Sequence, residues 1–291
     1  MRRILVTGAT GYIGRNLCSY LLKSGYEVNG SLLEKEKTEL LPAGVKPVVT
    51  GPISGETDWS EALEGIDGVV HLAAMVHQKE TPNSETKSLY RITNTDATAA
   101  LGEQALKKGV RSFVFLSTAA VYGLNKTTEP LAIDSPINPT TYYGKSKWEA
   151  EQKLTALFKK ARSSLTIFRP TMVYGPKAPG NFAQLSKMVK MGIPLPLGSI
   201  NNKRYFVFID KLVSLILEGL KNNEPGVIVR FACDNEPMST KKLLQFAAKW
   251  ENKKALILPF PTLLLRSFFS LARKKNDWEK LAESYMITNH S

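Results

Sequence analysis

The stretch Thr7-Gly8-Ala9-Thr10-Gly11-Tyr12-Ile13-Gly14 determines the fold that this sequence predicts. It follows the apolar residues 4–6 and precedes the helix-like residues 15–23, so the local order is strand, glycine turn and helix. The first glycine can take the positive φ of a tight turn, the second leaves the backbone open to a pyrophosphate, and the third lets the helix pack closely. Because a helix N-terminus offers N–H groups to an anion, the stretch predicts a phosphate-binding turn.

The composition is that of a globular protein without covalent or metal cross-links. The chain has 291 residues, 43% of them hydrophobic, which is enough for a large core. Its two cysteines, Cys18 and Cys233, have no Cys or His at ligand spacing, so we predict neither a metal site nor a disulfide and expect a cytoplasmic location. Thr7 and Gly8 interrupt the apolar N-terminal run too early for an export signal.

The C-terminal part of the chain is both apolar and basic. Residues 255–272 form the longest apolar stretch, but prolines and an arginine interrupt it, so we expect a loop and an amphipathic helix rather than a membrane span. The net charge is +13, and residues 241–280 hold ten Lys or Arg against three acidic residues. This region is either a solvated face or a surface for an anionic membrane or an anionic small substrate. No aromatic–basic reader motif accompanies it, so we expect no nucleic-acid partner.

Short apolar runs alternate with helix-length amphipathic segments over the first part of the chain. This alternation predicts a doubly wound, mostly parallel α/β sheet. The predicted strands are residues 4–6, 27–33, 45–49, 68–72, 112–116 and 165–168, and the clearest predicted helices are residues 60–64, 93–108 and 142–160. After Pro170 the sequence is punctuated by Gly and Pro. We therefore expect a Rossmann domain over residues 1–170 and a smaller substrate-binding lobe over residues 171–291, from which some segments return to the sheet.

Tyr143 and Lys147 lie four residues apart at the start of a predicted helix and therefore share one face. A tyrosine has a pKa near 10, but an adjacent ammonium favours the phenolate and makes proton exchange with an alcohol practicable. We predict that Tyr143 is the proton-transfer group. Lys147 would lower its pKa and bind ribose hydroxyls of a nicotinamide cofactor.

A second set of residues follows the predicted strand at 112–116. Thr118 stands where a parallel strand delivers its ligand-facing side chains, and it could hydrogen-bond a reacting oxygen. Together with the glycine turn, His71-Leu72-Ala73-Ala74 after another strand and Asn94 opening the 93–108 helix, the set resembles the extended short-chain dehydrogenase/reductase family, and within it the NAD-dependent epimerase/dehydratase group. The resemblance covers nearly the whole chain and is nearest to bacterial nucleotide-sugar enzymes of surface-polysaccharide synthesis.

The resemblance implies a set of binding residues. For the cofactor it implies Gly8, Thr10, Gly11, Tyr12, Ile13, Gly14, Ile53, Leu72, Ala73, Ala74, Asn94, Tyr143, Lys147, Arg169 and Pro170. For a UDP-sugar substrate it implies Thr118, Ala119, Asn181 and Arg204, the last two at the diphosphate. The expected cofactor is NAD, with NADP left open, because the second strand ends without an acidic residue and Lys35 and Lys37 follow it. The resemblance also implies a homodimer formed through the helices at 93–108 and 142–160.

The residues after Thr118 bear on the reaction. Sugar 4,6-dehydratases of the family place an acidic pair where this chain has Ala119 and Ala120, so dehydration and decarboxylation are not expected. The leading hypothesis is 4-epimerisation of a UDP-hexose or UDP-N-acetylhexosamine through a 4-keto intermediate. The alternatives are a UDP-4-keto-6-deoxy-sugar reductase or dehydrogenase and, from another class, a catalytically weak cofactor-binding scaffold. The chain ends at Ser291, before a C-terminal segment that covers the sugar in many relatives, so incomplete closure is a further expectation.

Overall fold

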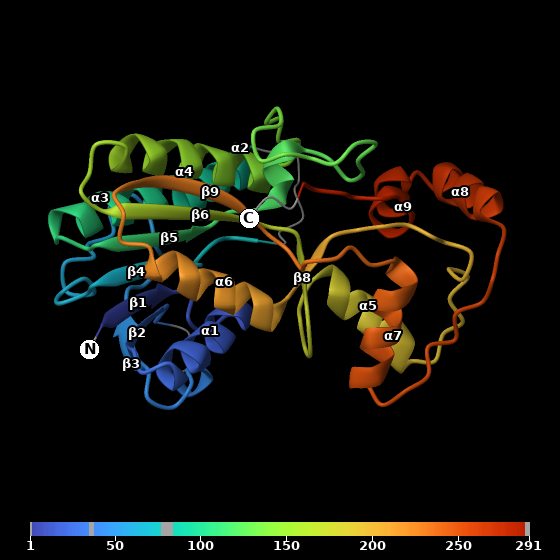
Figure 1. The fold of residues 1–291 in the computed structure, drawn as a ribbon, viewed down its shortest axis with the longest axis horizontal. Coiled ribbons are helices and arrows are strands. Elements are labelled where there is room, and N and C mark those ends of the chain that lie inside the picture. Colours follow the sequence, from blue (N-terminus) through green and yellow to red (C-terminus); the bar gives the residue numbers. More distant parts are fainter. Residues whose placement is uncertain (1, 35–37, 77–83, 289–291) are drawn as a thin grey trace. The chain divides into compact units, whose positions relative to one another are not determined.

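The computed structural model describes residues 2–34, 38–76 and 84–288, and Lys35 and Lys37 lie outside these ranges. The chain forms two compact units, each assembled from separate segments (Figure 1). Unit 1 consists of Met1–Gly123, Pro136–Pro170 and Ile209–Ala232. Unit 2 consists of Leu124–Ser135, Thr171–Phe208 and Cys233–Ser291.

Unit 1 is built on a parallel seven-stranded sheet, which confirms the predicted α/β Rossmann fold. The strand order is β3-β2-β1-β4-β5-β6-β9. The strands are β1 (Arg3–Thr7), β2 (Glu27–Leu32), β3 (Lys46–Val49), β4 (Gly68–His71), β5 (Ser112–Leu116), β6 (Ser164–Pro170) and β9 (Gly226–Ala232). The central strands are buried along their whole length, as expected where helices cover both faces of a parallel sheet.

Helices cover the two faces of this sheet (Figure 1). On one face lie α1 (Tyr12–Lys23) and α6 (Ile209–Lys221). On the other lie α2 (Ser84–Tyr90), a π-helical segment (Arg91–Asp96), α3 (Ala97–Lys107) and α4 (Tyr142–Phe158). The core under α3 and α4 includes Leu101, Phe113, Leu154, Phe158 and Ile167. Two short 3₁₀ turns, Thr38–Leu40 and Ala119–Tyr122, complete the unit.

Two predicted helices differ from the structure. Residues 60–64 form a turn in which the Leu63 N–H donates to the Trp59 carbonyl. This single turn already buries the side chains of Trp59 and Leu63. The helix expected to open at Thr93 is already running at Ser84, so Asn94 lies inside it rather than at its start. Elements α6 and β9 come from beyond residue 170 and belong to unit 1.

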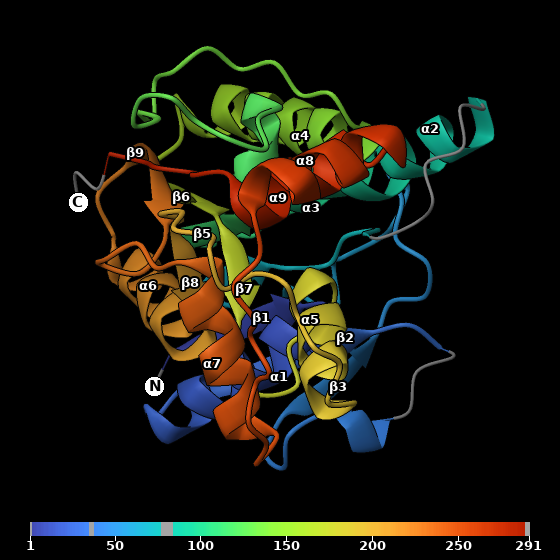
Figure 2. The same ribbon diagram turned by 90° about the vertical axis from the view of Figure 1, so that its right-hand side faces the viewer.

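Unit 2 is organised around a two-stranded parallel sheet, β7 (Met172–Tyr174) and β8 (Phe206–Phe208). Its helices are α5 (Asn181–Lys190), α7 (Thr240–Trp250), α8 (Thr262–Leu271) and α9 (Lys275–Ala282). Figure 2 shows α5 beside α7, and α8 beside α9. The Tyr174 ring lies within 6.3 Å of the ring centroids of Phe182, Phe206, Phe208, Phe246 and Trp250, which make an aromatic core.

No helix within residues 2–34, 38–76 and 84–288 has the length and apolar character needed to cross a bilayer. In the same ranges, no group of three or more His, Cys, Asp or Glu side chains is arranged to hold a metal ion.

Candidate active site

The glycine turn lies between the end of β1 and the start of α1. Gly8 has φ +66°, and a Cβ there would lie 2.9 Å from the Ala73 nitrogen, so a side chain is excluded by both conformation and space. Gly11 is the N-cap of α1 and offers no side-chain cap to the helix. A Cβ on Gly14 would lie 2.8 Å from the Ala9 Cα, so Gly14 lets α1 rest directly on the turn. The first-turn N–H groups have no acceptor within the helix, and this cradle fits a dinucleotide pyrophosphate.

The ends of β1 and β4 are tied together by a buried hydroxyl that sequence reasoning missed. The Thr7 Oγ1 accepts hydrogen bonds of 3.1 Å from both the Leu72 and the Ala73 N–H groups and lies 2.7 Å from the His71 Nδ1. Burial lowers the pKa of His71 to about 3, and the nearby Lys147 charge acts in the same direction. His71 is therefore a neutral structural residue. Leu72 and Ala73, both predicted to bind the cofactor, donate their backbone N–H groups to Thr7.

Thr118 and the predicted proton-transfer residue Tyr143 lie where β5 ends and α4 begins. The Thr118 backbone is extended, and its Oγ1 accepts a 3.1 Å hydrogen bond from the Ala120 N–H. The Thr141 hydroxyl caps α4 by accepting from the Gly144 N–H at 3.0 Å, which fixes the first turn carrying Tyr143. A side-chain hydrogen bond joins Thr118 to the half-buried Tyr143. The structure thus brings together the two residues expected to hold one substrate oxygen.

The protonation state of Tyr143 differs from the expectation. We expected Lys147 to lower its pKa, whereas burial raises the pKa of Tyr143 to about 12. The hydrogen bond from Thr118 opposes this rise, and Tyr90, whose ring packs edge-on at 6.4 Å, adds to it. Tyr143 is therefore protonated at neutral pH in the free protein. Besides Thr118, Tyr90 is a neighbour of Tyr143, and the sequence did not predict this contact.

Lys147 is almost completely buried, one helical turn beyond Tyr143. Its ammonium nitrogen lies 4.1 Å from the ring centroid of Phe115, on the neighbouring strand β5. Burial lowers the pKa of Lys147 to about 7, and the Glu151 carboxylate opposes the shift. A pKa near 7 means that Lys147 gains or loses its proton near neutral pH.

A buried ionic network lies behind Lys147, and the sequence analysis did not identify it. Arg169 binds the Glu151 carboxylate through Nε and Nη2, with its shortest contact at 2.7 Å, and its Nη1 donates to the Tyr122 hydroxyl at 2.5 Å. Ser117 also hydrogen-bonds Glu151. The Arg169 guanidinium, expected to flank the cofactor, is thus committed to the protein. The signal for Glu151 was its helical spacing, because residues 143, 147 and 151 share one face of α4.

Asn94 connects two parts of the site rather than facing a ligand. It is fully buried, its Oδ1 accepts from the Met75 N–H at 2.7 Å, and its Nδ2 donates to the Met75 carbonyl at 3.0 Å and to the Ser146 hydroxyl at 3.1 Å. The π-helical segment around it brings the side chain to this position. Asn94 therefore links the loop after β4 to α4.

The other predicted cofactor residues lie at or near the same edge of the sheet. Thr10 lies in the glycine turn, Tyr12 and Ile13 open α1, Ala74 follows β4, and Pro170 ends β6. The Ile53 side chain packs against the core, which leaves the prediction of a cofactor contact through its backbone untouched. The Tyr12 hydroxyl is buried with no hydrogen-bond partner among the described residues.

The two predicted diphosphate residues lie in unit 2. Asn181 is exposed at the first position of α5. The Arg204 Nη1 donates to the carbonyls of Asn125, Glu279 and Glu283, and its Nη2 donates to Asn125. Burial lowers the pKa of Arg204 to about 10. The guanidinium carbon of Arg204 also lies 5.4 Å from the ring centroid of Tyr285, so most of this side chain is engaged within unit 2.

A model of the NAD dependent epimerase/dehydratase family matches residues 4–230. The chain belongs to this family. A UDP-glucose 4-epimerase of Vibrio cholerae is 35% identical to this chain, over 98% of this chain and 87% of the relative. An Escherichia coli O157:H7 protein is 30% identical over 91% of this chain and 78% of the relative. Its name is N-acetyl-alpha-D-glucosaminyl-diphospho-ditrans,octacis-undecaprenol 4-epimerase.

A solved structure is similar over most of its length. It is the UDP-glucuronic acid 4-epimerase of Bacillus cereus in complex with NAD, with a TM-score of 0.71, 27% identity and coverage of 89% of this chain and 87% of that one. The predicted family, enzyme class and cofactor type are confirmed at this level. The glycine cradle at the N-terminus of α1 has a geometry that fits the pyrophosphate of NAD.

Proposed function

We propose that this protein is an NAD-dependent 4-epimerase of a UDP-hexose or UDP-N-acetylhexosamine. The observation that carries the proposal is the Thr118–Tyr143 hydrogen bond beside the buried Lys147, followed by Ala119 and Ala120 instead of an acidic pair. This set contains one proton shuttle and no second acid or base for elimination. The Vibrio cholerae and Escherichia coli relatives, both 4-epimerases by name, support it.

The residues of the chain divide the work as follows. Thr118 orients the C4 oxygen of the sugar, and Tyr143 takes the hydroxyl proton as the C–H bond at C4 is broken, then returns it when the hydride is delivered to the other face. Bound NAD supplies the hydride acceptor and donor. Because the pKa of Tyr143 is raised in the free protein, a positive charge on Lys147 would have to favour its phenolate during the oxidation step. The family resemblance further proposes Asn181 and Arg204 as residues that bind the diphosphate.

The test is incubation of the protein with NAD and UDP-N-acetylglucosamine or UDP-glucose, with the anomeric protons followed by NMR. We expect the galacto epimer with the wild type and a loss of about 10²- to 10⁴-fold in rate for Tyr143→Phe. Tyr142→Phe removes the adjacent hydroxyl and should leave the rate within about twofold of the wild type. Equal rates for Tyr143→Phe and the wild type would contradict the role of Tyr143.

A ketoreductase would behave differently. It would leave both UDP-sugars unchanged, reduce a UDP-4-keto-6-deoxy-sugar with NADH, and release its cofactor at each turnover. The Escherichia coli relative is named for a sugar carried on diphospho-undecaprenol. A parallel incubation with N-acetylglucosamine linked through diphosphate to a polyprenol therefore distinguishes a uridine carrier from a lipid carrier.

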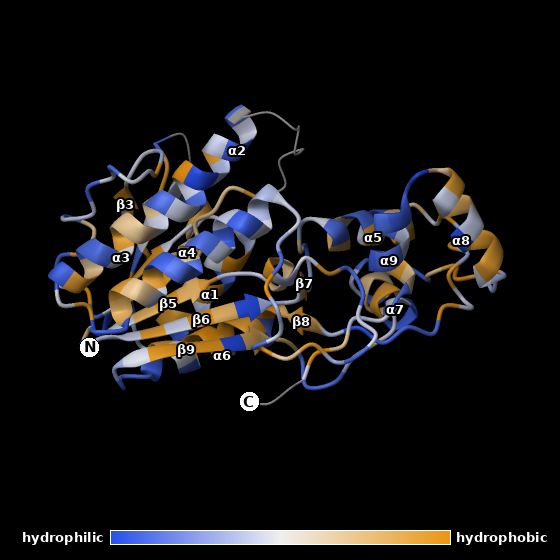
Figure 3. Ribbon diagram, turned by 90° about the horizontal axis from the view of Figure 1, so that it is seen from above, coloured by the Kyte–Doolittle hydropathy of each residue, from blue (hydrophilic) through white to orange (hydrophobic). Residues whose placement is uncertain are grey.

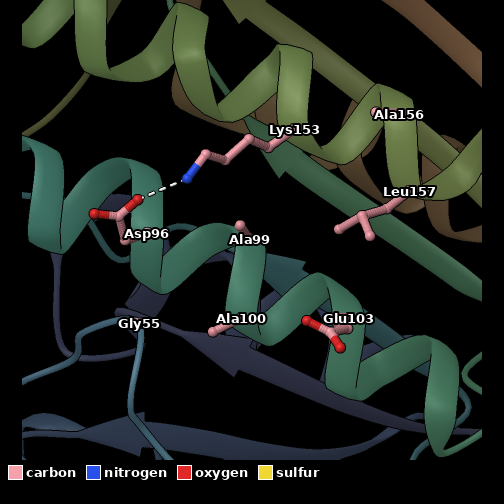
Figure 4. Close-up of a pocket in the computed structure, with 8 residues that line it drawn as sticks. All are labelled: Gly55, Asp96, Ala99, Ala100, Glu103, Lys153, Ala156 and Leu157. Carbon is pink, nitrogen blue, oxygen red and sulfur yellow. Dashed lines mark hydrogen bonds and ion pairs between the residues drawn. The ribbon is translucent and has the colours of Figure 1, made fainter.

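A homodimer through α3 and α4 is also proposed from the family resemblance. A pocket of about 440 Å³ lies on these helices, and Lys153 donates to Asp96 at its edge at 2.7 Å. Figure 4 shows the small side chains of Ala99, Ala100 and Ala156, together with Leu157, in its lining. Small residues let two helical faces approach closely. The residues that line it do not include Thr118, Tyr143 or Lys147, so this surface is separate from the proposed proton-transfer site.

A further inference from the structure

Helix α8 exposes an apolar face. Leu264, Phe268 and Leu271 follow i, i+4, i+7 spacing and therefore share a face, and their exposed fractions are 59%, 65% and 86%. Leu263, next to them, is also exposed, and Figure 3 colours much of α8 as hydrophobic. Scattered surface leucines are ordinary, but four large exposed apolar side chains on one helix of ten residues are typical of interaction surfaces.

The opposite face of α8 holds the helix in place. Leu265 is buried, and the Phe269 ring packs 5.8 Å from the Trp278 ring of α9. The indole N–H of Trp278 donates to the Glu283 carboxylate at 2.9 Å. Because this face already supplies the contacts that fix α8, the exposed leucines and phenylalanine contribute little to folding.

The segment before α8 also exposes apolar side chains. Leu256, Leu258 and Phe260 are exposed as well. Backbone hydrogen bonds to Leu195 hold this segment, with the Leu195 N–H donating to the Leu256 carbonyl at 2.7 Å and the Leu258 N–H donating to the Leu195 carbonyl at 2.8 Å. The apolar surface therefore covers an ordered loop and an ordered helix.

The charges that flank α8 along the sequence have one sign, up to Asp277 in α9. Residues 252–276 contain six Lys or Arg and no Asp or Glu. These are Lys253, Lys254, Arg266, Arg273, Lys274 and Lys275, and all six are exposed. Cations beside a large apolar face complement a surface that offers anionic head groups above hydrocarbon.

We propose that residues 256–275, with α8 at their centre, form a docking surface for an anionic lipid bilayer. A helix of ten residues is about 15 Å long, so α8 would lie in the plane of the interface with its apolar face among the upper acyl chains. The inference does not depend on the proposed reaction, because it rests on exposure and charge in unit 2 alone.

The experiment is co-sedimentation of the full chain with vesicles of phosphatidylcholine alone or with about one third phosphatidylglycerol. The wild type should bind the anionic vesicles at least about tenfold more tightly than neutral ones, and ~0.5 M NaCl should weaken this binding. The triple variant Leu264→Ser, Phe268→Ser, Leu271→Ser should lose at least about tenfold in affinity. The pair Lys274→Glu, Lys275→Glu should lose a similar factor.

Matched controls keep the result specific. Met191→Ser removes an exposed apolar side chain at the end of α5, and Lys159→Glu with Lys160→Glu makes the same charge change in unit 1; both should bind like the wild type. Unchanged thermal unfolding of the triple variant shows that it folds. The proposal is overturned if the wild type does not bind anionic vesicles, if the triple variant binds equally well, or if the triple variant only changes the association state of the protein.

Discussion

Three ionisable side chains, Tyr143, Lys147 and Glu151, follow one another along one face of α4. Tyr143 meets the end of β5, Lys147 is buried over Phe115, and Glu151 is enclosed by Arg169 and Ser117. The pKa of Tyr143 is raised and that of Lys147 is lowered, both mainly by burial. Burial therefore favours the uncharged form of each of these two side chains relative to the same group in water.

The buried Lys147 should make stability depend on pH. Its pKa falls from 10.5 to about 7 on folding, so between these values the unfolded chain binds a proton that the folded chain does not. The free energy of unfolding should therefore rise with pH through this window, and the penalty should be fully present below pH 7. Urea unfolding of the cofactor-free protein at about pH 6 and about pH 9 should show a smaller difference for Lys147→Met than for the wild type. Lys145→Met, an exposed site on the same helix, should keep the wild-type difference.

Removing one partner of the buried Glu151–Arg169 ion pair should lower the free energy of unfolding. Glu151→Gln leaves a buried guanidinium without its counter-charge and should reduce the free energy of unfolding by about 3–5 kcal/mol. Replacing both partners by methionine should recover part of this loss, because no unpaired charge then remains. Chemical denaturation measures both effects, with the exposed Glu149→Gln as the control. A Glu151→Gln protein as stable as this control would contradict the assignment.

At the scale of elements, the glycine turn and α1 form a rigid unit with no space at Gly14. A Cβ there would lie 2.8 Å from the Ala9 Cα, so Gly14→Ala must push α1 away from the turn. We expect NAD affinity to fall by more than about tenfold by calorimetric titration, because the N–H groups move with the helix. Arg15→Ala alters an exposed position on the same helix and should bind NAD as the wild type does. Equal affinities for the two variants would show that the turn does not hold the cofactor.

Local sequence predicted those elements whose apolar pattern is unbroken. The strand positions near residues 4, 68, 112 and 165 were apparent because buried parallel strands are continuously apolar. Strand β9 was not assigned, since it is an edge strand with partly exposed residues and Arg230 in its middle. The turn at residues 60–64 was taken for a helix because one helical turn and an isolated turn share the same apolar spacing.

Site residues were predictable where the chemistry is local. Tyr143, Lys147 and Thr118 stand in short motifs, and a side-chain hydrogen bond joins Thr118 to Tyr143. Thr7, Tyr90 and the Glu151–Arg169 pair act through partners far along the chain, and no spacing in a single sequence reports such contacts.

At the scale of the molecule, the proposed homodimer makes a direct prediction. Ala156→Arg places a long cation in the pocket between α3 and α4 while keeping a good helix former. If two copies meet on this face, sedimentation velocity should show a dimer for the wild type and a monomer for the variant. Lys159→Ala, one turn further along α4, should remain dimeric. A monomeric wild type, or a dimeric Ala156→Arg protein, would contradict the proposed interface.

The discontinuity of unit 1 has a consequence for synthesis on the ribosome. Strand β6 pairs along its whole length with β9, which is made only after residues 171–225 have emerged. Until then β6 is an open sheet edge whose Leu165, Ile167 and Phe168 side chains are buried in the finished protein. Such edges promote association between nascent chains. Translation through residues 171–225 is therefore the interval in which this chain most needs a chaperone.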